Sequence, residues 1–355
     1  MIGRGRTDEW IRSVGMLLAG SLPLVGLLAA CERPTDPVVD AESNADVAAA
    51  YDPTRFEEGL LAVETWLEEG RPVESERIAR RLVSLNPGSI DALEAHGRCL
   101  VILGAMERSE GRGDGSAFDR EALDRYRMVL AEAGKSPRPD HLHAAGLAAQ
   151  AAGEVEEALG YHVRADGIEP DNAQHAIFAG NILAGLERTE EARAWFERAT
   201  ETDPGEPWSW AGLAEVHRQR MSWEEALLAI GRARSLAPGN RGFRVSQARV
   251  LRESGRAREA AMMLFALEED DRATLGITTE LAAACTEIGE HRRAAEAWAT
   301  LARRLPEDFR PALNAASAWL EAGEPRRTVL WLEVAESCGA PRAEIEAIRS
   351  RLGER

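Results

Sequence analysis

Residues 207–240, PWSWAGLAEVHRQRMSWEEALLAIGRARSLAPGN, are one copy of a block of 34 residues that recurs along this chain. Small side chains stand eighth and twentieth in this copy, at Ala214 and Ala226, and Pro238 stands near its end. Two antiparallel helices can cross closely only where neither carries a bulky side chain. Proline stops a helix because it lacks the N–H donor and clashes with the preceding turn. The block therefore predicts a helix, a turn, a second helix and a stop.

The block occurs eight times, and the last six copies follow one another without an insertion or a deletion. The copies start near residues 56, 90, 139, 173, 207, 241, 275 and 309. Their eighth position is small, as at Gly97, Gly146, Gly180, Ala214, Ala248 and Ala282. Their fifteenth position is often glycine, at Gly70, Gly104, Gly153, Gly255, Gly289 and Gly323. A glycine there suits the left-handed cap that would end the first helix.

This pattern resembles the tetratricopeptide repeat, whose signature matches the fifth copy at Trp210, Leu213, Ala214, Ala226, Ala233 and Pro238. The resemblance covers residues 56–341 and implies an all-α, right-handed superhelical solenoid of about eight helix-turn-helix repeats. A generic alanine-rich helical bundle is the alternative, but it does not explain a fixed period. Residues 342–355 then predict a capping helix, because Ile345, Ile348 and Leu352 fall on one stripe.

The third copy starts fifteen residues late, and most of the excess falls within the second copy. Residues 105–117 are rich in glycine and charge, which predicts an insertion loop between the two helices of that copy. Such a loop either serves binding or is simply a tolerated insertion.

The N-terminus resembles a bacterial lipoprotein signal peptide. Residues 1–30 carry arginines followed by an apolar run of 17 residues, shorter than the roughly 20 that span a bilayer. The run ends in Leu-Ala-Ala before Cys31, which by resemblance receives the lipid. The alternative is an uncleaved signal anchor, and both place the repeats outside the cytoplasm on a membrane tether. Because Glu32 rather than Asp follows the cysteine, the resemblance favours the outer membrane over the inner one.

Residues 31–55 form the predicted tether. They are acidic and rich in Ala, Asp and Pro, with few large apolar side chains. Such a segment cannot bury enough surface to fold alone, so we expect a flexible link between membrane and repeats.

Composition argues for a soluble helical protein without catalytic chemistry. The chain is 45% apolar, 29% charged and 5% aromatic, and its net charge of −17 disfavours nucleic acid as a partner. His141 and His143 alternate, which on a helix turns their side chains about 200° apart. His162 falls on a core-facing position. We therefore expect no catalytic residue, no metal and no cofactor, and the protein is not expected to be an enzyme.

Three cysteines follow Cys31, namely Cys99, Cys285 and Cys338. A bridge between Cys285 and Cys338 is one possibility, and buried free thiols are the other.

The resemblance implies that the second, fifth, ninth and twelfth positions of each block face a concave groove. The candidate peptide-binding residues of this groove are His143, Gln150, Gln174, Asn181, Trp208, Glu215, Arg218, Arg249 and Arg252. An aromatic ring beside three arginines is typical of an interface hot spot, and arginine forks would suit an acidic or carboxylate-ended peptide. The alternative is that Trp208 packs on the neighbouring repeat and that the arginines pair with Glu215 and Glu253.

These observations together predict a membrane-tethered, extracytoplasmic scaffold that binds a protein or peptide and helps to assemble or localise an envelope complex. The alternative is an accessory subunit that recruits an envelope enzyme, such as a hydrolase or a polysaccharide-synthesis complex. The expected role in an envelope complex rests on analogy with other proteins of this architecture.

Overall fold

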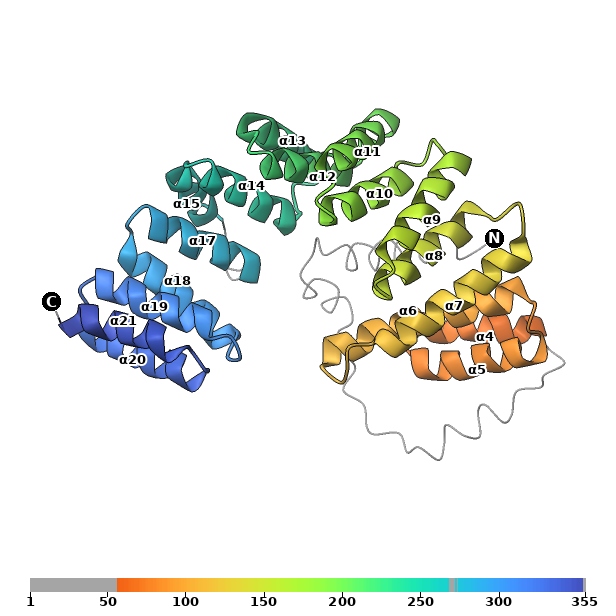
Figure 1. The fold of residues 1–355 in the computed structure, drawn as a ribbon, viewed down its shortest axis with the longest axis horizontal. Helices are drawn as coiled ribbons and strands as arrows, with labels where there is room; N and C mark the ends of the chain where they lie inside the picture. Colours follow the sequence, from red (N-terminus) through yellow and green to blue (C-terminus); the bar gives the residue numbers. More distant parts are fainter. Residues whose placement is uncertain (1–55, 268–271, 273, 354–355) are drawn as a thin grey trace. The chain divides into compact units, whose positions relative to one another are not determined.

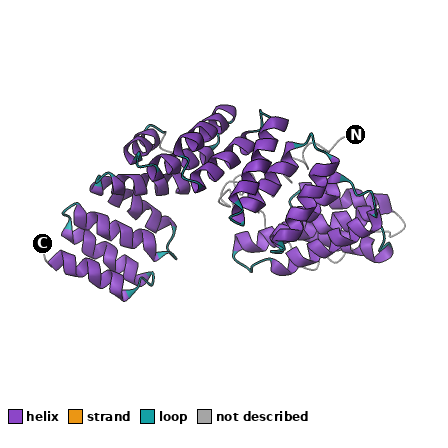
Figure 2. Cartoon of the chain, turned by 45° about the horizontal axis from the view of Figure 1, so that its top comes forward, coloured by secondary structure: helices purple, strands orange, loops and turns teal. Residues whose placement is uncertain are grey.

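The computed structural model describes residues 56–267, 272 and 274–353, and every regular element in that part of the chain is an α-helix (Figures 1 and 2). The helices are α4 (Phe56–Glu68), α5 (Pro72–Leu85), α6 (Ile90–Glu110), α7 (Ser116–Ala133), α8 (Pro139–Ala151), α9 (Val155–Ile168), α10 (Ala173–Gly185), α11 (Thr189–Thr202), α12 (Pro207–Gln219), α13 (Trp223–Leu236), α14 (Arg241–Glu253), α15 (Ala257–Phe265), α17 (Leu275–Glu287), α18 (His291–Arg304), α19 (Phe309–Glu321), α20 (Pro325–Ser337) and α21 (Arg342–Gly353).

The helices form two compact units, which divide between Asp203 and Pro204. Helices α4 to α11 belong to the first unit, and α12 to α21 belong to the second. Eight helices start at the residues where the sequence blocks begin, and each packs against the helix that follows it. These first helices are α4, α6, α8, α10, α12, α14, α17 and α19. The packed unit of the fold is therefore one helix hairpin per block.

The small eighth position is where the two helices of a hairpin meet. A Cβ atom added at Gly180 would lie 2.9 Å from the ring of Phe196, which stands twenty-fourth in the same block. Gly97 leaves the same space for the ring of Tyr126. Three blocks with alanine in this place bury a branched aliphatic side chain at the twenty-fourth position, namely Ile230, Leu264 and Leu332, whereas the seventh block has the half-buried Trp298 there. The sizes of the two positions are thus matched within each hairpin, as close packing requires.

In every block except the second, the fifteenth position has a left-handed backbone, even where it is not glycine. Gly153 and Gly255 have φ values of 82° and 80°, and Glu187 and Met221 take the same place in their blocks with φ of 59°. Their backbone N–H groups bond to carbonyls at the end of the first helix, as in the other blocks. A β-carbon is unfavourable in this conformation, so these two turns are strained by their side chains.

We expect Met221→Gly to raise the free energy of unfolding by roughly 0.5–1 kcal/mol, because relief of the left-handed strain exceeds the extra flexibility of glycine in the unfolded chain. The side chain is 71% exposed and loses little packing. Urea denaturation followed by far-UV circular dichroism measures the change. Met221→Ala is the control, since it keeps the β-carbon and the strain. A glycine variant no more stable than the alanine variant would contradict this account.

The insertion in the second block takes a different form from the predicted loop. Helix α6 continues to Glu110 and α7 begins at Ser116, so only 111–115 connect them, and the prediction of a loop over 105–117 was too long. No residue from 105 to 110 breaks a helix, and the first left-handed glycine is Gly111, with φ of 65°. The prediction of a cap at Gly104 was also wrong. That glycine lies inside α6, where an added Cβ would stand 2.5 Å from the carboxylate of Asp119.

Helix α21 covers the end of the second unit. Ile345 and Ile348 are buried and share a core cluster with Leu313, Leu320 and Leu332 of the last hairpin. The helix therefore closes an apolar surface that a further repeat would otherwise cover.

The predicted signal peptide (1–30), the lipidated Cys31 and the tether (31–55) lie outside the described residues. Across residues 56–267, 272 and 274–353, no helix has both the length and the apolar character needed to cross a bilayer.

Candidate interaction surfaces

The predicted groove residues fall into two sets. His143, Gln150, Gln174 and Asn181 lie on α8 and α10 of the first unit. Trp208, Glu215, Arg218, Arg249 and Arg252 lie on α12 and α14 of the second unit. Because the two sets belong to different units, each surface is described separately.

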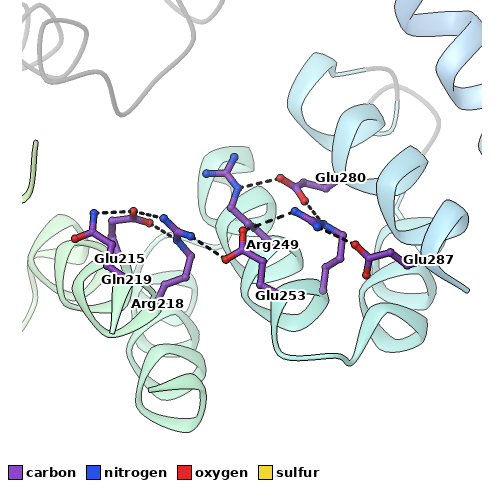
Figure 3. Close-up of polar contacts among 8 residues, drawn as sticks. Glu215, Arg218, Gln219, Arg249, Glu253, Glu280 and Glu287 are labelled. Atoms are coloured by element: carbon purple, nitrogen blue, oxygen red, sulfur yellow. Dashed lines mark hydrogen bonds and ion pairs between the residues drawn. The ribbon is translucent and has the colours of Figure 1, made fainter. Parts of the chain in front are cut away.

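The three arginines predicted for the groove, Arg218, Arg249 and Arg252, each donate hydrogen bonds to glutamates. Figure 3 shows this group of side chains, with Arg218 and Arg249 labelled. Arg218 donates two bonds to Glu215, of 2.6 and 2.9 Å, and a third of 2.8 Å to Glu253 on α14. This fork-to-fork arrangement is the strongest geometry available to an arginine and a carboxylate. The hydrogen bonds that Arg218 donates to Glu215, and then the one to Glu253, outweigh the effect of burial and raise the pKa of Arg218.

Glu280 on α17 accepts hydrogen bonds from both of the other arginines, Arg249 and Arg252. Arg249 Nε donates to its Oε1 at 2.9 Å, and Arg252 Nε donates to its Oε2 at 3.1 Å. Arg252 also donates to Glu287 at 2.8 Å. Burial opposes the charge of Arg252, but the hydrogen bonds to Glu287 and Glu280 outweigh it, and its pKa is raised. We call these seven residues, Arg218, Arg249, Arg252, Glu215, Glu253, Glu280 and Glu287, the arginine–glutamate network.

The network determines what this surface offers to a ligand. Three arginines face four glutamates, so the network carries a negative formal charge. An acidic peptide would have to displace in-chain carboxylates before it could use the arginine forks. The hollow between α12 and α14 beside Arg218 and Arg249 measures about 20 Å³, which is room for a single water.

The Trp208 ring also packs against another side chain of the protein. This ring lies 4.9 Å from that of buried Phe243 on α14, edge to face at 66°. Trp208 thus packs on the neighbouring repeat, and Arg218 pairs with Glu215 and Glu253, as in the alternative weighed from the sequence; Arg249 pairs with Glu280 instead. The contacts of the arginines extend further than expected, to Glu280 and Glu287 on α17.

We expect Glu280→Gln to lower the free energy of unfolding by about 1–3 kcal/mol, because it removes a charged acceptor shared by two arginines. The Glu280 side chain is 6% exposed. Glu215→Gln is the matched control; its side chain is 41% exposed, and we expect a loss below about 1 kcal/mol. Urea titration of both variants gives the comparison. Equal losses would mean that burial of Glu280 does not strengthen the network.

A larger hollow lies between α17, α18 and α19 of the second unit. It measures about 300 Å³ and is lined by Ala283, Thr286, Glu287, His291, Trp298, Asn314, Ser317, Ala318 and Glu321. Ala283 and Ser317 occupy the ninth position of their blocks, and Thr286 occupies a twelfth, so the predicted groove positions do line a hollow here. Trp298 is held on one wall by a 3.1 Å hydrogen bond from its Nε1 to Thr286.

In the first unit, the two alternating histidines of α8 point to different neighbours, as the helix geometry predicts. His141 lies against Arg138 and Glu94. His143 lies beside two other imidazoles, with ring-centroid distances of 5.4 Å to His162 on α9 and 5.9 Å to His175 on α10. The sequence did not predict this cluster, because its members are separated by 19 and 13 residues and stand on unrelated positions of their blocks. Gln150, Gln174 and Asn181 are half-buried.

The cysteines of the described region are free thiols, so Cys285 and Cys338 do not pair in this structure. Burial raises the pKa of Cys99 to about 12 and that of Cys285 to about 11. Neither thiol forms a reactive thiolate near neutral pH.

Comparison with known proteins gives the fold. No protein-family model and no curated protein sequence matches the chain. Among solved structures, a tetratricopeptide repeat protein from Parabacteroides merdae is 16% identical, with a TM-score of 0.52 over 84% of this chain and 99% of that one. Yeast Tom70 is 12% identical, with a TM-score of 0.55 over 97% of this chain and 69% of its own.

This chain therefore has a tetratricopeptide-repeat fold, and the predicted class, an all-α array of helix-turn-helix repeats, is confirmed. At these identities the likeness shows the fold alone, and function has to be argued from the surfaces of this chain.

Proposed function

We propose that this protein is a scaffold that binds another protein or a peptide, and that a lipid on Cys31 tethers it to a membrane outside the cytoplasm. The observation that carries the binding role is the hollow between α17, α18 and α19. Its volume of about 300 Å³ falls at the small end of the range of about 300–1,000 Å³ for ligand pockets. That is enough to receive side chains of a partner's segment rather than a whole domain.

The lining of the hollow favours a peptide segment. Trp298 offers a large apolar surface of the kind found at interface hot spots. Asn314 carries an amide and Ser317 a hydroxyl, and both groups can donate to and accept from a peptide backbone. Glu287 and Glu321 border the same hollow, but each is already paired with an arginine, Arg252 and Arg351 respectively, so the lining favours a neutral segment.

The envelope location rests on the N-terminal sequence. The apolar run of residues 14–30 followed by Cys31 supports export and lipidation, and residues 31–55 would let the repeats stand off the membrane. In this setting the scaffold would assemble or localise an envelope complex, and recruitment of an envelope enzyme is one form of that role.

A photo-crosslinking amino acid at Ser317, in the full chain expressed in a bacterial envelope, tests the binding role. We expect it to capture a partner that the same probe at Glu296, exposed on α18, does not capture. Trp298→Leu should reduce the Ser317 product at least about tenfold, because loss of an aromatic hot spot typically costs 2 kcal/mol or more. Equal crosslinking from both positions, or a product unaffected by Trp298→Leu, would refute the hollow as the binding site.

Metabolic labelling with a radioactive fatty acid tests the tether. We expect the full chain to incorporate label and to fractionate with membranes, whereas Cys31→Ala loses both properties because the acceptor thiol is gone. Cys338→Ala is the control, since it removes a different cysteine and should leave the label unchanged. Label that persists in Cys31→Ala would show that the lipoprotein assignment is wrong.

A further inference from the structure

Three histidines from three helices meet inside the first unit. They are His143 on α8, His162 on α9 and His175 on α10, and each offers a ring nitrogen such that these three atoms lie within 4.8 Å of one another. We propose that His143, His162 and His175 bind a divalent transition metal of the zinc class. This site is separate from the hollow of the second unit and does not depend on the proposed scaffold function.

His162 is the strongest single observation. Its side chain is fully buried, and neither ring nitrogen has a hydrogen-bond partner in the protein. A neutral imidazole carries one N–H donor and one lone pair, and buried groups of this kind are nearly always bonded. Packing does not explain the choice of histidine, because the equivalent positions of other blocks hold apolar side chains such as Phe196 and Ile230.

The backbone makes room for the His162 ring. A Cβ atom added at Gly146 would lie 2.5 Å from His162 Nε2, so this ring nitrogen fits only against a glycine. The ring also stacks on Phe178, with centroids 5.0 Å apart and planes 12° from parallel. His162 is therefore held in one place between a glycine and an aromatic wall.

His175 has the arrangement of a supported metal ligand. Its Nε2 lies 3.4 Å from the carboxylate of Glu169 and 3.4 Å from the side-chain amide of Asn172, while its buried Nδ1 has no partner in the protein. Histidines that bind metals usually donate their other N–H to a carboxylate, which fixes the ring and raises its basicity. With the proton on Nε2, the Nδ1 lone pair of His175 is free for a metal.

His143 completes the cluster from the solvent side. It is half-buried, its ring lies 4.8 Å from that of Phe178, and it is the most accessible of the three imidazoles.

The donor set selects the metal class. Imidazole nitrogens suit Zn²⁺, Cu²⁺ and Ni²⁺, whereas Mg²⁺ and Ca²⁺ prefer oxygen. Tetrahedral zinc, with Zn–N bonds of about 2.0–2.1 Å, would bring the nitrogens to roughly 3.3 Å apart, a modest contraction that side-chain rotation can provide. Three protein ligands leave a fourth position for water or another group. A bound metal would link both helices of the third block to the first helix of the fourth.

Metal titration of the full chain, purified through an affinity tag that contains no histidine, tests the proposal. We expect Co²⁺ to bind with one equivalent per chain and to give the visible absorption of four-coordinate cobalt, and Zn²⁺ to displace it. Zinc should also raise the melting temperature. No saturable binding of either ion by the wild-type protein would overturn the proposal.

Three variants show whether the cluster is the site. His143→Ala changes the half-buried ligand and should weaken binding of Zn²⁺ at least about tenfold, and Glu169→Gln should weaken it by about 10–100-fold through loss of the supporting carboxylate. His217→Ala, a histidine on α12 outside both the cluster and the hollow, should bind as the wild type does. Circular dichroism of each metal-free variant checks its fold. Wild-type affinity in both folded variants, His143→Ala and Glu169→Gln, would refute the assignment.

Discussion

The close approach of two helices at the eighth position of each block is the constraint on which this structure depends. Gly180 faces Phe196 and Gly146 faces His162 at distances that no β-carbon would permit. In three blocks with alanine at this position, the twenty-fourth side chain is a buried aliphatic one, such as Ile230. Where two helices cross, a small side chain on one must face a large side chain on the other, because protein interiors are close-packed and tolerate neither overlap nor void. Each hairpin is assembled around this one fit.

The repeat also determines which distant residues become neighbours. Arg218 meets Glu253 and Arg252 meets Glu287, and both pairs are separated by 35 residues, one more than the period. Side chains at the same height of successive first helices therefore lie next to each other. This register builds the arginine–glutamate network from α12 through α14 to α17.

The arginine–glutamate network and the hollow differ in how their side chains are used. At α12 and α14 the charged side chains are used internally, and the space between the helices holds no more than a water. At α17 and α19 the same block positions carry small or polar side chains, Ala283, Thr286 and Ser317, and a hollow of about 300 Å³ opens. The size of the side chains at these positions, rather than their charge, decides where a hollow opens.

The sequence by itself determined the helix starts, the hairpin order and the capping helix. These features follow from local signals that recur in each block: a small side chain, a large side chain and a residue that stops a helix. Because the signals repeat at a fixed period, each block can be interpreted by itself. It did not predict that α6 runs through to Glu110, since glycine and charge favour a loop only where tertiary contacts do not extend the helix. Only the tertiary structure decided that the arginines are already paired and that His143, His162 and His175 converge. Those outcomes depend on side-chain direction across neighbouring helices, which a linear pattern does not specify.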